Sequence, residues 1–380
     1  MTSRIFNGWS LLFFGLGAAA IAGVATGHEL RAVGALAVAL AIWGYRRLPR
    51  TQFVVFSIVA VVLCVASVLS AALAFDVYLH HRFFRSGGYN VWGYRGEPLS
   101  RKRPGEVRLA MLGGSLVFGF GVDMDETIPA YLRRELSDRT VVNLGLNGDG
   151  AYAFPPTLKD YAYLELDQVM LYSGIVDFVP RKVVFRHQSG MFLATGYLPI
   201  LPIVPLAKWL RVTDLWDAAR VPVDGGDRAA TKAANFALQM QAAIGNQLAK
   251  IAEVDRQPRR ASIDSVCGPR FDFYCGEVSD AVLEARRQGL EVFVVTEPYL
   301  LFSEVSSEFH HAQQAALAAM IARRFGGDAQ VHYLNMGNAV NVKDPTLCFD
   351  GVMHLTAKGN AQLAHQLAAA LKTVERRAPR

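Results

Sequence analysis

Three apolar stretches open the chain and form the first pattern in its order of hydrophobic and polar positions. They run from Trp9 to Ala25, from Ala32 to Tyr45 and from Phe53 to Tyr78. A membrane-spanning helix needs roughly 20 apolar residues, so the third stretch is long enough, whereas the second needs flanking side chains that reach the interface. The first resembles a signal peptide, but further apolar stretches follow it closely. We therefore predict a membrane anchor of about three transmembrane helices in residues 1–80.

From Val107 onward, short apolar runs alternate with segments of helical spacing. This alternation predicts a parallel sheet covered on both faces, an α/β/α sandwich. Ligands bind at the carboxyl ends of the strands in such sheets, so Ser115, Gly148, Asp177 and Pro298, which follow strands, are expected at one edge. The predicted strands are Val107 to Leu112, Val141 to Leu144, Gln168 to Tyr172 and Leu290 to Thr296, and the predicted helices are Thr127 to Leu136, Tyr274 to Gln288, His310 to Phe325 and Ala361 to Val374.

The segment at about 180–260 interrupts this alternation. Its apolar run from Met191 to Leu210 is long enough to cross a membrane, but its three prolines would break a membrane helix. We expect an extended flap that lies on the domain or dips into the membrane interface, or else a buried loop. The alanine-rich stretch from Thr231 to Glu253 is predicted to be helical. The chain thus consists of the anchor, a juxtamembrane linker at 81–106, and a domain at 107–380 that carries this insertion.

The charge balance argues against a nucleic-acid partner. The chain has 39 Lys and Arg against 33 Asp and Glu, a net charge of +6, and a mean hydropathy of +0.21. The basic residues are spread among loops and do not form the aromatic-interleaved stripe that nucleic acid needs. Membrane lipid is the expected surrounding of the anchor, and the sequence identifies no protein partner.

The orientation in the membrane is predicted from the short loop that holds Arg46, Arg47 and Arg50. Short basic loops stay in the cytoplasm, so three crossings place the domain on the periplasmic or extracellular face. Arg82 and Arg85, just beyond the third stretch, argue for the opposite orientation.

The four cysteines show no metal-binding pattern. Cys64 lies in an apolar run, and Cys348 stands close to a motif described below. Cys267 and Cys275 are close neighbours that form a disulfide if the domain lies outside the cytosol, and unpaired, packed thiols are the alternative.

Two segments far apart in the chain offer the parts of a serine nucleophile system. Ser115 lies in the glycine-flanked turn Gly113-Gly114-Ser115 directly after a buried strand, which would expose its hydroxyl at the sheet edge. Asp350 and His354 lie in a loop before the last predicted helix. A serine hydroxyl needs a base, and the base needs an orienting carboxylate. Each segment alone has a structural explanation, such as a tight turn or a helix cap.

Together these segments resemble the SGNH/GDSL hydrolase superfamily, from about Val107 to the C-terminus. The first sequence block, usually Gly-Asp-Ser, is present as the variant Gly113-Gly114-Ser115, which is similar to that of membrane-anchored bacterial members. The glycine of the second block corresponds to Gly148, and the last block to Asp350, His354 and the Leu-Thr-x-x-Gly-Asn that follows. The resemblance implies a flavodoxin-like α/β/α sandwich that needs no metal or organic cofactor, and acyl transfer through an acyl-serine.

Two departures from the family pattern are visible. In the third block, Gly-x-Asn-Asp, Val176 replaces the asparagine that donates to the oxyanion, while Asp177 is kept. The remaining oxyanion donors would be the backbone N–H groups of Ser115 and Gly148. The family also has two residues between the aspartate and the histidine, and this chain has three between Asp350 and His354. Asp350 could therefore be displaced, with Asp344 or a backbone carbonyl orienting the histidine.

Other polar residues have two interpretations. Arg186, beside His187, either binds an anionic or carbohydrate group of a substrate or forms a surface salt bridge. Glu297, followed by Pro298, fits a turn better than a catalytic acid.

The leading hypothesis is a serine ester hydrolase or O-acyltransferase of a bacterial inner membrane that acts on acylated envelope carbohydrate or lipid. The rival is a catalytically impaired member of the fold that serves as a binding or assembly subunit, which Val176 and the Asp-His spacing motivate. A transporter is disfavoured because the three apolar stretches carry no intramembrane charge that would mark a pathway.

Overall fold

The computed structural model describes residues 49–85, 88–178, 184–201, 267–301 and 304–377. The chain divides into two compact units, Met1–Val77 and Tyr78–Arg380. The apolar stretches from Trp9 to Ala25 and from Ala32 to Tyr45, and the predicted helix from Thr231 to Glu253, lie outside the described residues.

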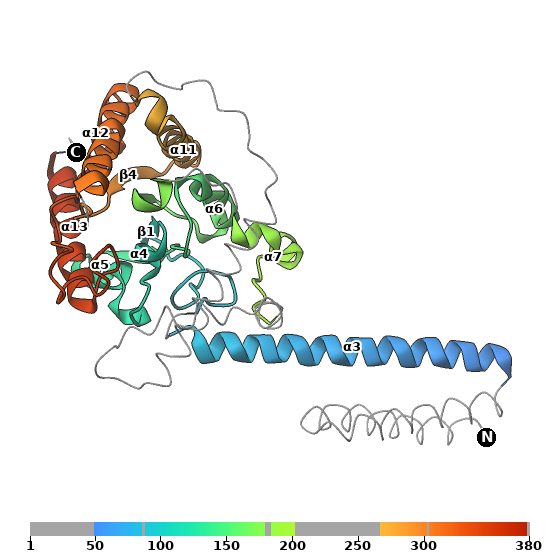
Figure 1. Cartoon of the computed structure of the whole chain (residues 1–380). Coiled ribbons are helices and arrows are strands. Elements are labelled where there is room, and N and C mark those ends of the chain that lie inside the picture. The colour runs from blue at the N-terminus through green and yellow to red at the C-terminus, as the bar shows by residue number, and fades with distance from the viewer. Residues whose placement is uncertain (1–48, 86–87, 179–183, 202–266, 302–303, 378–380) are drawn as a thin grey trace. The chain divides into compact units, whose positions relative to one another are not determined.

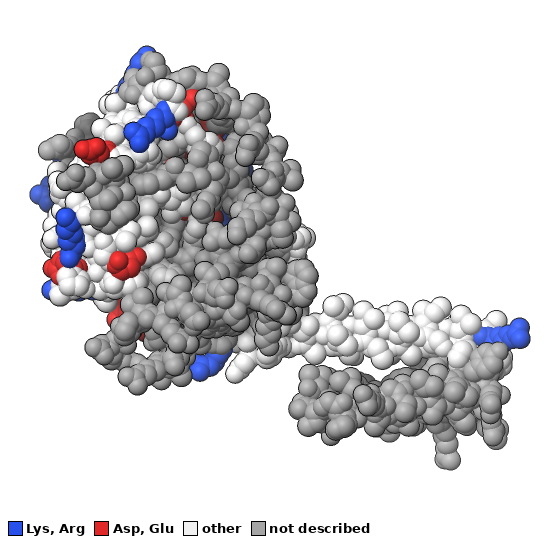
Figure 2. Space-filling model, in the orientation of Figure 1, with Lys and Arg blue, Asp and Glu red and all other residues white. Residues whose placement is uncertain are grey.

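Helix α3, Arg50–Phe83, contains the third apolar stretch. Its segment Arg50–Arg82 is the one helix within the described residues that is long and apolar enough to cross a membrane. The large apolar side chains along it, such as Val61 and Val68, are exposed. Figure 2 shows the visible side of α3 as uncharged beyond the basic group at its start. The helix therefore supports a membrane anchor, while the number of crossings stays a prediction.

A parallel five-stranded sheet in the order β2-β1-β3-β4-β5 forms the centre of the second unit. The register places Leu109 of β1 between Val141 of β2 and Gln168 of β3. This order is that of doubly wound, flavodoxin-like sheets, which leave the carboxyl ends of their strands open to a ligand. The strands are β1 (Val107–Leu112), β2 (Arg139–Asn143), β3 (Gln168–Ser173), β4 (Glu291–Thr296) and β5 (Val331–Leu334).

Helices cover both faces of this sheet (Figure 1). Alternate strand residues belong to two separate hydrophobic cores: Ala110 and Leu112 pack in the core of one face, and Leu109 and Met111 in that of the other. The first core includes α6 (Phe154–Asp160), α11 (Gly268–Arg287) and α12 (Glu304–Phe325), and the second includes α5 (Ile128–Glu135) and α13 (Ala357–Arg377). The predicted α/β/α sandwich is confirmed.

Several elements differ from the sequence predictions. Strand β5 was not predicted, and neither was α6. The run that begins at Met191 was expected to be extended, but its first residues form the short helix α7 (Gly190–Thr195). Ser189 starts this helix, because its hydroxyl accepts the N–H of Phe192.

The predicted linker at 81–106 is largely folded into the domain. Tyr94 and Arg95 are 2% and 1% exposed. The Arg95 guanidinium donates to the carbonyl oxygens of Phe118 and Gly119, at 3.0 and 2.9 Å. These carbonyls lie at the end of α4 (Ser115–Phe118), where the carbonyl oxygens of a helix lack intrahelical donors. The segment thereby supports the turn that carries Ser115.

Candidate active site

Ser115 is the first residue of α4, directly after β1 and the two glycines. A Cβ added at Gly114 would lie 2.8 Å from the carbonyl oxygen of Asp149 and 3.0 Å from Cγ2 of Val176. Only glycine therefore fits between these two loops, and their packing fixes the turn. The Ser115 side chain remains half-buried at the carboxyl edge of the sheet.

His354 lies beside Ser115 although 239 residues separate them in the chain. Its Nε2 is 3.0 Å from Ser115 Oγ, and its Nδ1 is 2.5 Å from Asp350 Oδ2. An N–H at Nδ1 that donates to the carboxylate leaves Nε2 as an acceptor for the serine proton. The structure thus brings together the three residues that the sequence motifs singled out.

The longer spacing between Asp350 and His354 is taken up by a turn around the Asp350 carboxylate. Oδ1 accepts the backbone N–H groups of Val352, Met353 and His354 at 2.9, 2.9 and 3.1 Å. Gly351 has φ +67°, a left-handed conformation that glycine adopts without strain. Oδ2 stays free for the imidazole, so the extra residue does not displace the acid.

The electrostatics of Asp350 suit an orienting carboxylate. Burial raises its pKa, but the hydrogen bond from His354 and those from backbone N–H groups outweigh this and hold the pKa well below its ordinary value. Asp344, the alternative orienting residue, instead accepts the N–H and the hydroxyl of Thr346, both at 2.8 Å.

Two phenylalanines flank the imidazole of His354 and were not predicted from the sequence. The Phe120 and Phe349 ring centroids lie 4.7 and 5.9 Å from that of His354. Gly121, with φ +82°, allows this packing, since a Cβ there would lie 2.7 Å from the Phe349 ring. Both side chains are half-buried. Their only sequence signal was their position beside the two motifs.

The side of Ser115 where an oxyanion would form is bordered by Gly148 and Val176. Gly148 has φ +79°, and a Cβ added there would have no neighbouring atom within 4 Å. Within the described residues, neither the Ser115 N–H nor the Gly148 N–H donates to a protein acceptor. Val176, half-buried against Gly114, contributes only an alkyl surface. Two backbone N–H groups are therefore available to donate to an oxyanion, and the third block adds no side-chain donor.

Buried carboxyl groups hold the loops that follow β2 and β3 and lie beside the serine. Asp177 Oδ1 accepts the N–H of Ala151 at 2.8 Å, and Glu297 Oε2 accepts that of Ile175 at 2.6 Å. Burial raises the pKa of Asp177 to about 7 and that of Glu297 to about 8. Glu297, expected in a turn, is therefore a buried support of the third block.

Arg186 is 1% exposed, so it lies neither at the surface nor in an ion pair with solvent access. Its Nη2 donates to the Thr157 hydroxyl, and its guanidinium lies 5.1 Å from the centroid of the Tyr161 ring. The positive charge counteracts the effect of burial on Asp149, whose pKa burial raises to about 7. Both sequence interpretations of Arg186 assumed that the side chain reaches solvent or substrate. Packing against residues distant in the sequence buries it instead. His187 pairs with Asp160 at 2.7 Å.

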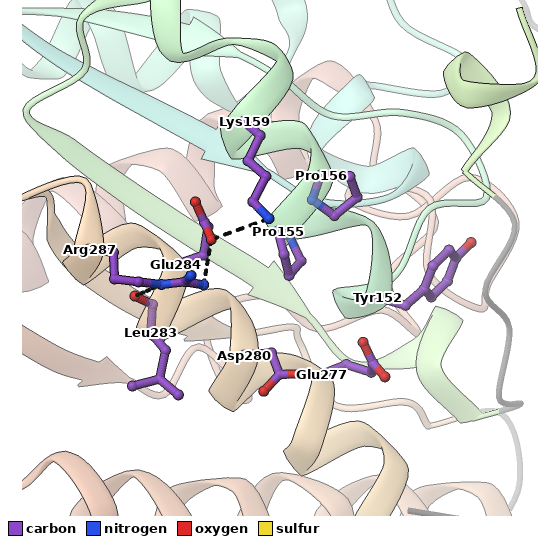
Figure 3. A pocket seen from close by; sticks show the side chains of 9 residues that line it. All are labelled: Tyr152, Pro155, Pro156, Lys159, Glu277, Asp280, Leu283, Glu284 and Arg287. Atoms are coloured by element: carbon purple, nitrogen blue, oxygen red, sulfur yellow. Dashed lines mark hydrogen bonds and ion pairs between the residues drawn. The ribbon is translucent and has the colours of Figure 1, made fainter. Parts of the chain in front are cut away.

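A cavity of about 550 Å³ lies between α6 and α11, and none of Ser115, His354 and Asp350 lines it. Glu284 at its wall is 3.7 Å from Lys159 Nζ and 2.5 Å from Arg287 Nη2 (Figure 3). The Glu284 carboxylate is thus shared by two cationic side chains. Tyr152, at the other end, donates its hydroxyl to the Gly148 carbonyl oxygen at 3.0 Å, so this wall supports the Gly148 loop.

No protein-family model and no curated protein sequence matches the chain. Among solved structures, the chain is similar to a GDSL-like lipase from Bacteroides thetaiotaomicron VPI-5482, with 12% identity over 74% of this chain and 93% of that one and a TM-score of 0.37. It is also similar to a catalytic mutant of an acetylxylan esterase from Geobacillus stearothermophilus, with 12% identity, coverage of 72% and 96%, and a TM-score of 0.37. A family 3 carbohydrate esterase from Clostridium thermocellum is similar with 11% identity over 72% of this chain and 100% of that one, and a TM-score of 0.37. At these TM-scores the likenesses add nothing to what the chain's own sheet order and side-chain geometry show.

Taken together, the site can activate a hydroxyl and hold a developing negative charge. Within the described ranges, no group of three or more His, Cys, Asp or Glu side chains is placed to hold a metal ion. Cys348, whose thiol donates to Asp350 Oδ1 at 3.3 Å, has a pKa that burial raises to about 11, so it stays protonated beside the acid.

Proposed function

We propose that the chain is a membrane-anchored serine ester hydrolase of the SGNH/GDSL type. The proposal rests on the relay from Asp350 through His354 to Ser115, with 2.5 and 3.0 Å between the facing atoms. A serine hydroxyl becomes an effective nucleophile when a histidine takes its proton and a carboxylate stabilises the imidazolium. Ser115 is the nucleophile, His354 the base and Asp350 the orienting acid.

The reaction proceeds in two steps. Ser115 Oγ attacks the acyl carbonyl carbon while His354 Nε2 takes its proton, and the proton passes to the leaving alcohol oxygen as the ester C–O bond breaks. Water or an acceptor hydroxyl then gives a proton to His354 and attacks the acyl-serine, and Ser115 regains a proton as the product leaves. The N–H groups of Ser115 and Gly148 donate to the oxyanion in both steps. Water yields a carboxylic acid, and a sugar hydroxyl yields a new ester.

The substrate we propose is acylated carbohydrate or lipid of the bacterial cell envelope. Helix α3, which is long and apolar enough to cross a membrane, supports a substrate that belongs to the cell envelope. The half-buried Phe120 and Phe349 beside the histidine offer apolar surface to an acyl chain or to the apolar face of a sugar.

We place the catalytic unit on the periplasmic side of the inner membrane. The basic loop from Arg46 to Arg50 supports this orientation. The disulfide between Cys267 and Cys275 supports it as well, since disulfides persist in oxidising compartments.

The rival function is that of a non-catalytic binding or assembly subunit, and Val176 favours it. Loss of a side-chain oxyanion donor costs on the order of 100-fold or more in rate, so a chain without it can be a member that lost its activity.

A fluorophosphonate probe, which reacts with activated serines, separates the two functions. The wild-type chain should be labelled, Ser115→Ala should not, and the control Ser100→Ala should be labelled fully. Ser115→Ala should also lower kcat for p-nitrophenyl acetate by about a thousandfold or more. Equal labelling of wild type and Ser115→Ala would overturn the serine assignment, and a folded wild type without labelling or hydrolysis would establish the binding subunit.

A further inference from the structure

Exposed apolar side chains gather at one place on the unit Tyr78–Arg380. Among the described residues of this unit, the large apolar side chains with at least 38% exposure are Tyr78, Trp92, Tyr163, Met191, Leu193 and Leu283. Single exposed apolar residues are ordinary on protein surfaces, whereas a cluster marks an interaction site. Four of these, Trp92, Tyr163, Met191 and Leu193, lie on segments that meet at a common centre.

Tyr161 is the centre of the cluster. Its hydroxyl donates to the carbonyl oxygen of Trp92 at 2.8 Å, and its ring centroid is 6.0 Å from that of Tyr163. It is 6.4 Å from the ring of Phe192, the buried residue of α7 that lies between Met191 and Leu193. Three separate segments, which carry Trp92, Tyr163, Met191 and Leu193, thus meet at Tyr161, and we call these four residues the apolar rim.

The apolar rim is fastened to the last turn of α3, within the same unit. His80 Nε2 lies 2.7 Å from the carbonyl oxygen of Leu198, just after α7, and its Nδ1 lies 2.9 Å from that of Tyr89, just before Trp92. Leu198 in turn donates its N–H to Val91 at 3.1 Å. The segments that carry the rim are therefore held at the end of the apolar helix.

Chain continuity makes this end a membrane interface if α3 crosses a bilayer. The apolar run from Phe53 to Tyr78 covers about 39 Å as a helix, enough for a hydrocarbon core of about 30 Å with some tilt. His80 follows this run by two residues. Groups within hydrogen-bonding distance of His80 then lie at the level of the lipid headgroups.

The composition of the rim matches that location. Trp92 and Tyr163, like Tyr78, are aromatic residues with a polar tip, the type enriched at membrane-water interfaces. Met191 and Leu193, 48% and 61% exposed, project apolar chains of the kind that insert at the headgroup boundary.

We propose that the apolar rim docks on the phospholipid surface of the membrane that α3 crosses. This inference rests on the membrane anchoring in the proposed function, but not on its chemistry. Docking fixes the catalytic unit against the bilayer at a second point besides the helix, so that acylated groups at the headgroup level are presented to a fixed site.

Nitroxide accessibility in the full-length protein tests the docking. The spin label is placed by Leu193→Cys in a background that carries Cys64→Ser and Cys348→Ser, with the Cys267–Cys275 disulfide intact, in vesicles of phosphatidylcholine and phosphatidylglycerol. Gln366→Cys, on the exposed side of α13 at the opposite face of the sheet, is the control. The label at 193 should collide more with oxygen than with a water-soluble nickel complex, and the label at 366 should show the reverse. Equal nickel accessibility at both sites, or spin–spin broadening at 193 at low protein density, would overturn the proposal in favour of a free surface or a contact between copies.

An activity measurement with the native cysteines adds a second readout. The double variant Met191→Asp and Leu193→Asp should hydrolyse p-nitrophenyl acetate at the wild-type rate but lose about tenfold or more on an ester presented in the vesicles, because the rim no longer partitions into the interface. A variant that matches the wild-type rate on both substrates would contradict docking. Immersion of site 193 without fluorophosphonate labelling would instead refute only the proposed chemistry.

Discussion

The two carboxylate oxygens of Asp350 have separate roles. Oδ2 faces the imidazole of His354, while Oδ1 accepts three backbone N–H groups. The hydrogen bonds that close the turn are also those that hold the pKa of Asp350 low, so the acid stays ionised throughout the neutral range. The same turn that gives this loop its shape thus keeps a negative charge beside the histidine, where it stabilises an imidazolium.

Val176 offers a gain-of-function experiment. Its side chain borders Gly114 next to Ser115, so an asparagine there would place an amide N–H near the oxyanion. Val176→Asn should raise kcat for p-nitrophenyl acetate by about tenfold or more at little change in KM, since a single oxyanion donor is worth on the order of 100-fold. Val176→Ala, which adds no donor, should give no increase. A folded Val176→Asn with unchanged kcat would show that this wall does not face the oxyanion.

The sequence predicted the residues that stand in recognisable short motifs. It missed the residues that tertiary packing brings to the site. Ser115, Asp350 and His354 stand in motifs whose order and spacing could be recognised. Phe120 and Phe349 meet only after β1 and the last loop come together, so no local pattern marks them. Arg186 and Glu297 have charged side chains that usually lie outside, and their burial depends on distant partners.

At the scale of elements, the loops after β2 and β3 are held by buried acids whose protonation the fold favours. Burial raises the pKa of Glu297 from an ordinary value near 4.5 to about 8, with the nearby Asp177 adding to the rise. The folded state therefore binds a proton that the unfolded chain releases near pH 4.5. The stability from this group is full below about pH 4.5 and is lost as pH rises to about 8.

Glu297→Gln should remove this pH dependence, because glutamine keeps an acceptor for the Ile175 N–H and cannot ionise. In detergent, the Tm of the variant minus the Tm of the wild type should increase by about 3 °C or more between pH 4.5 and pH 8. Glu106→Gln is the control of opposite sign, since hydrogen bonds from Arg108 lower the pKa of Glu106 to about 2 and its stabilising effect grows with pH. A Tm difference for Glu297→Gln that is constant with pH would refute the buried protonation.

Strands with continuous apolar runs were predicted well because they are buried on both sides. All six residues of β3 are buried. Strand β5 was missed because it is a four-residue edge strand in which only Leu334 is buried, so its pattern is weak. In α6, two prolines in the first turn hid a short helix, although proline at this position is compatible with a helix start.

At the scale of the whole molecule, two independent features bear on the proposed orientation of the unit Tyr78–Arg380 across a membrane. The disulfide joins Cys267, just before α11, to Cys275 within it, and such bonds are rare in a reducing cytosol. The arginines at positions 46, 47 and 50 precede α3 and favour a cytoplasmic start of that helix. Both favour the proposal that its other end, and the unit Tyr78–Arg380, lie outside.

Labelling of single cysteines on the two sides of α3 tests this orientation. In the full-length chain with Cys64→Ser and Cys348→Ser, the disulfide leaves no other thiol to react, so Glu97→Cys and Thr51→Cys each report one side. Glu97 is exposed, with 57% of its side chain accessible, and belongs to the unit Tyr78–Arg380. A membrane-impermeant maleimide should label Glu97→Cys in intact spheroplasts and Thr51→Cys only after lysis, because a span of about 30 Å of hydrocarbon separates the two ends of the apolar run. The reverse pattern would place the site in the cytosol, as an even number of crossings with an inside N-terminus requires, and would exclude periplasmic envelope substrates.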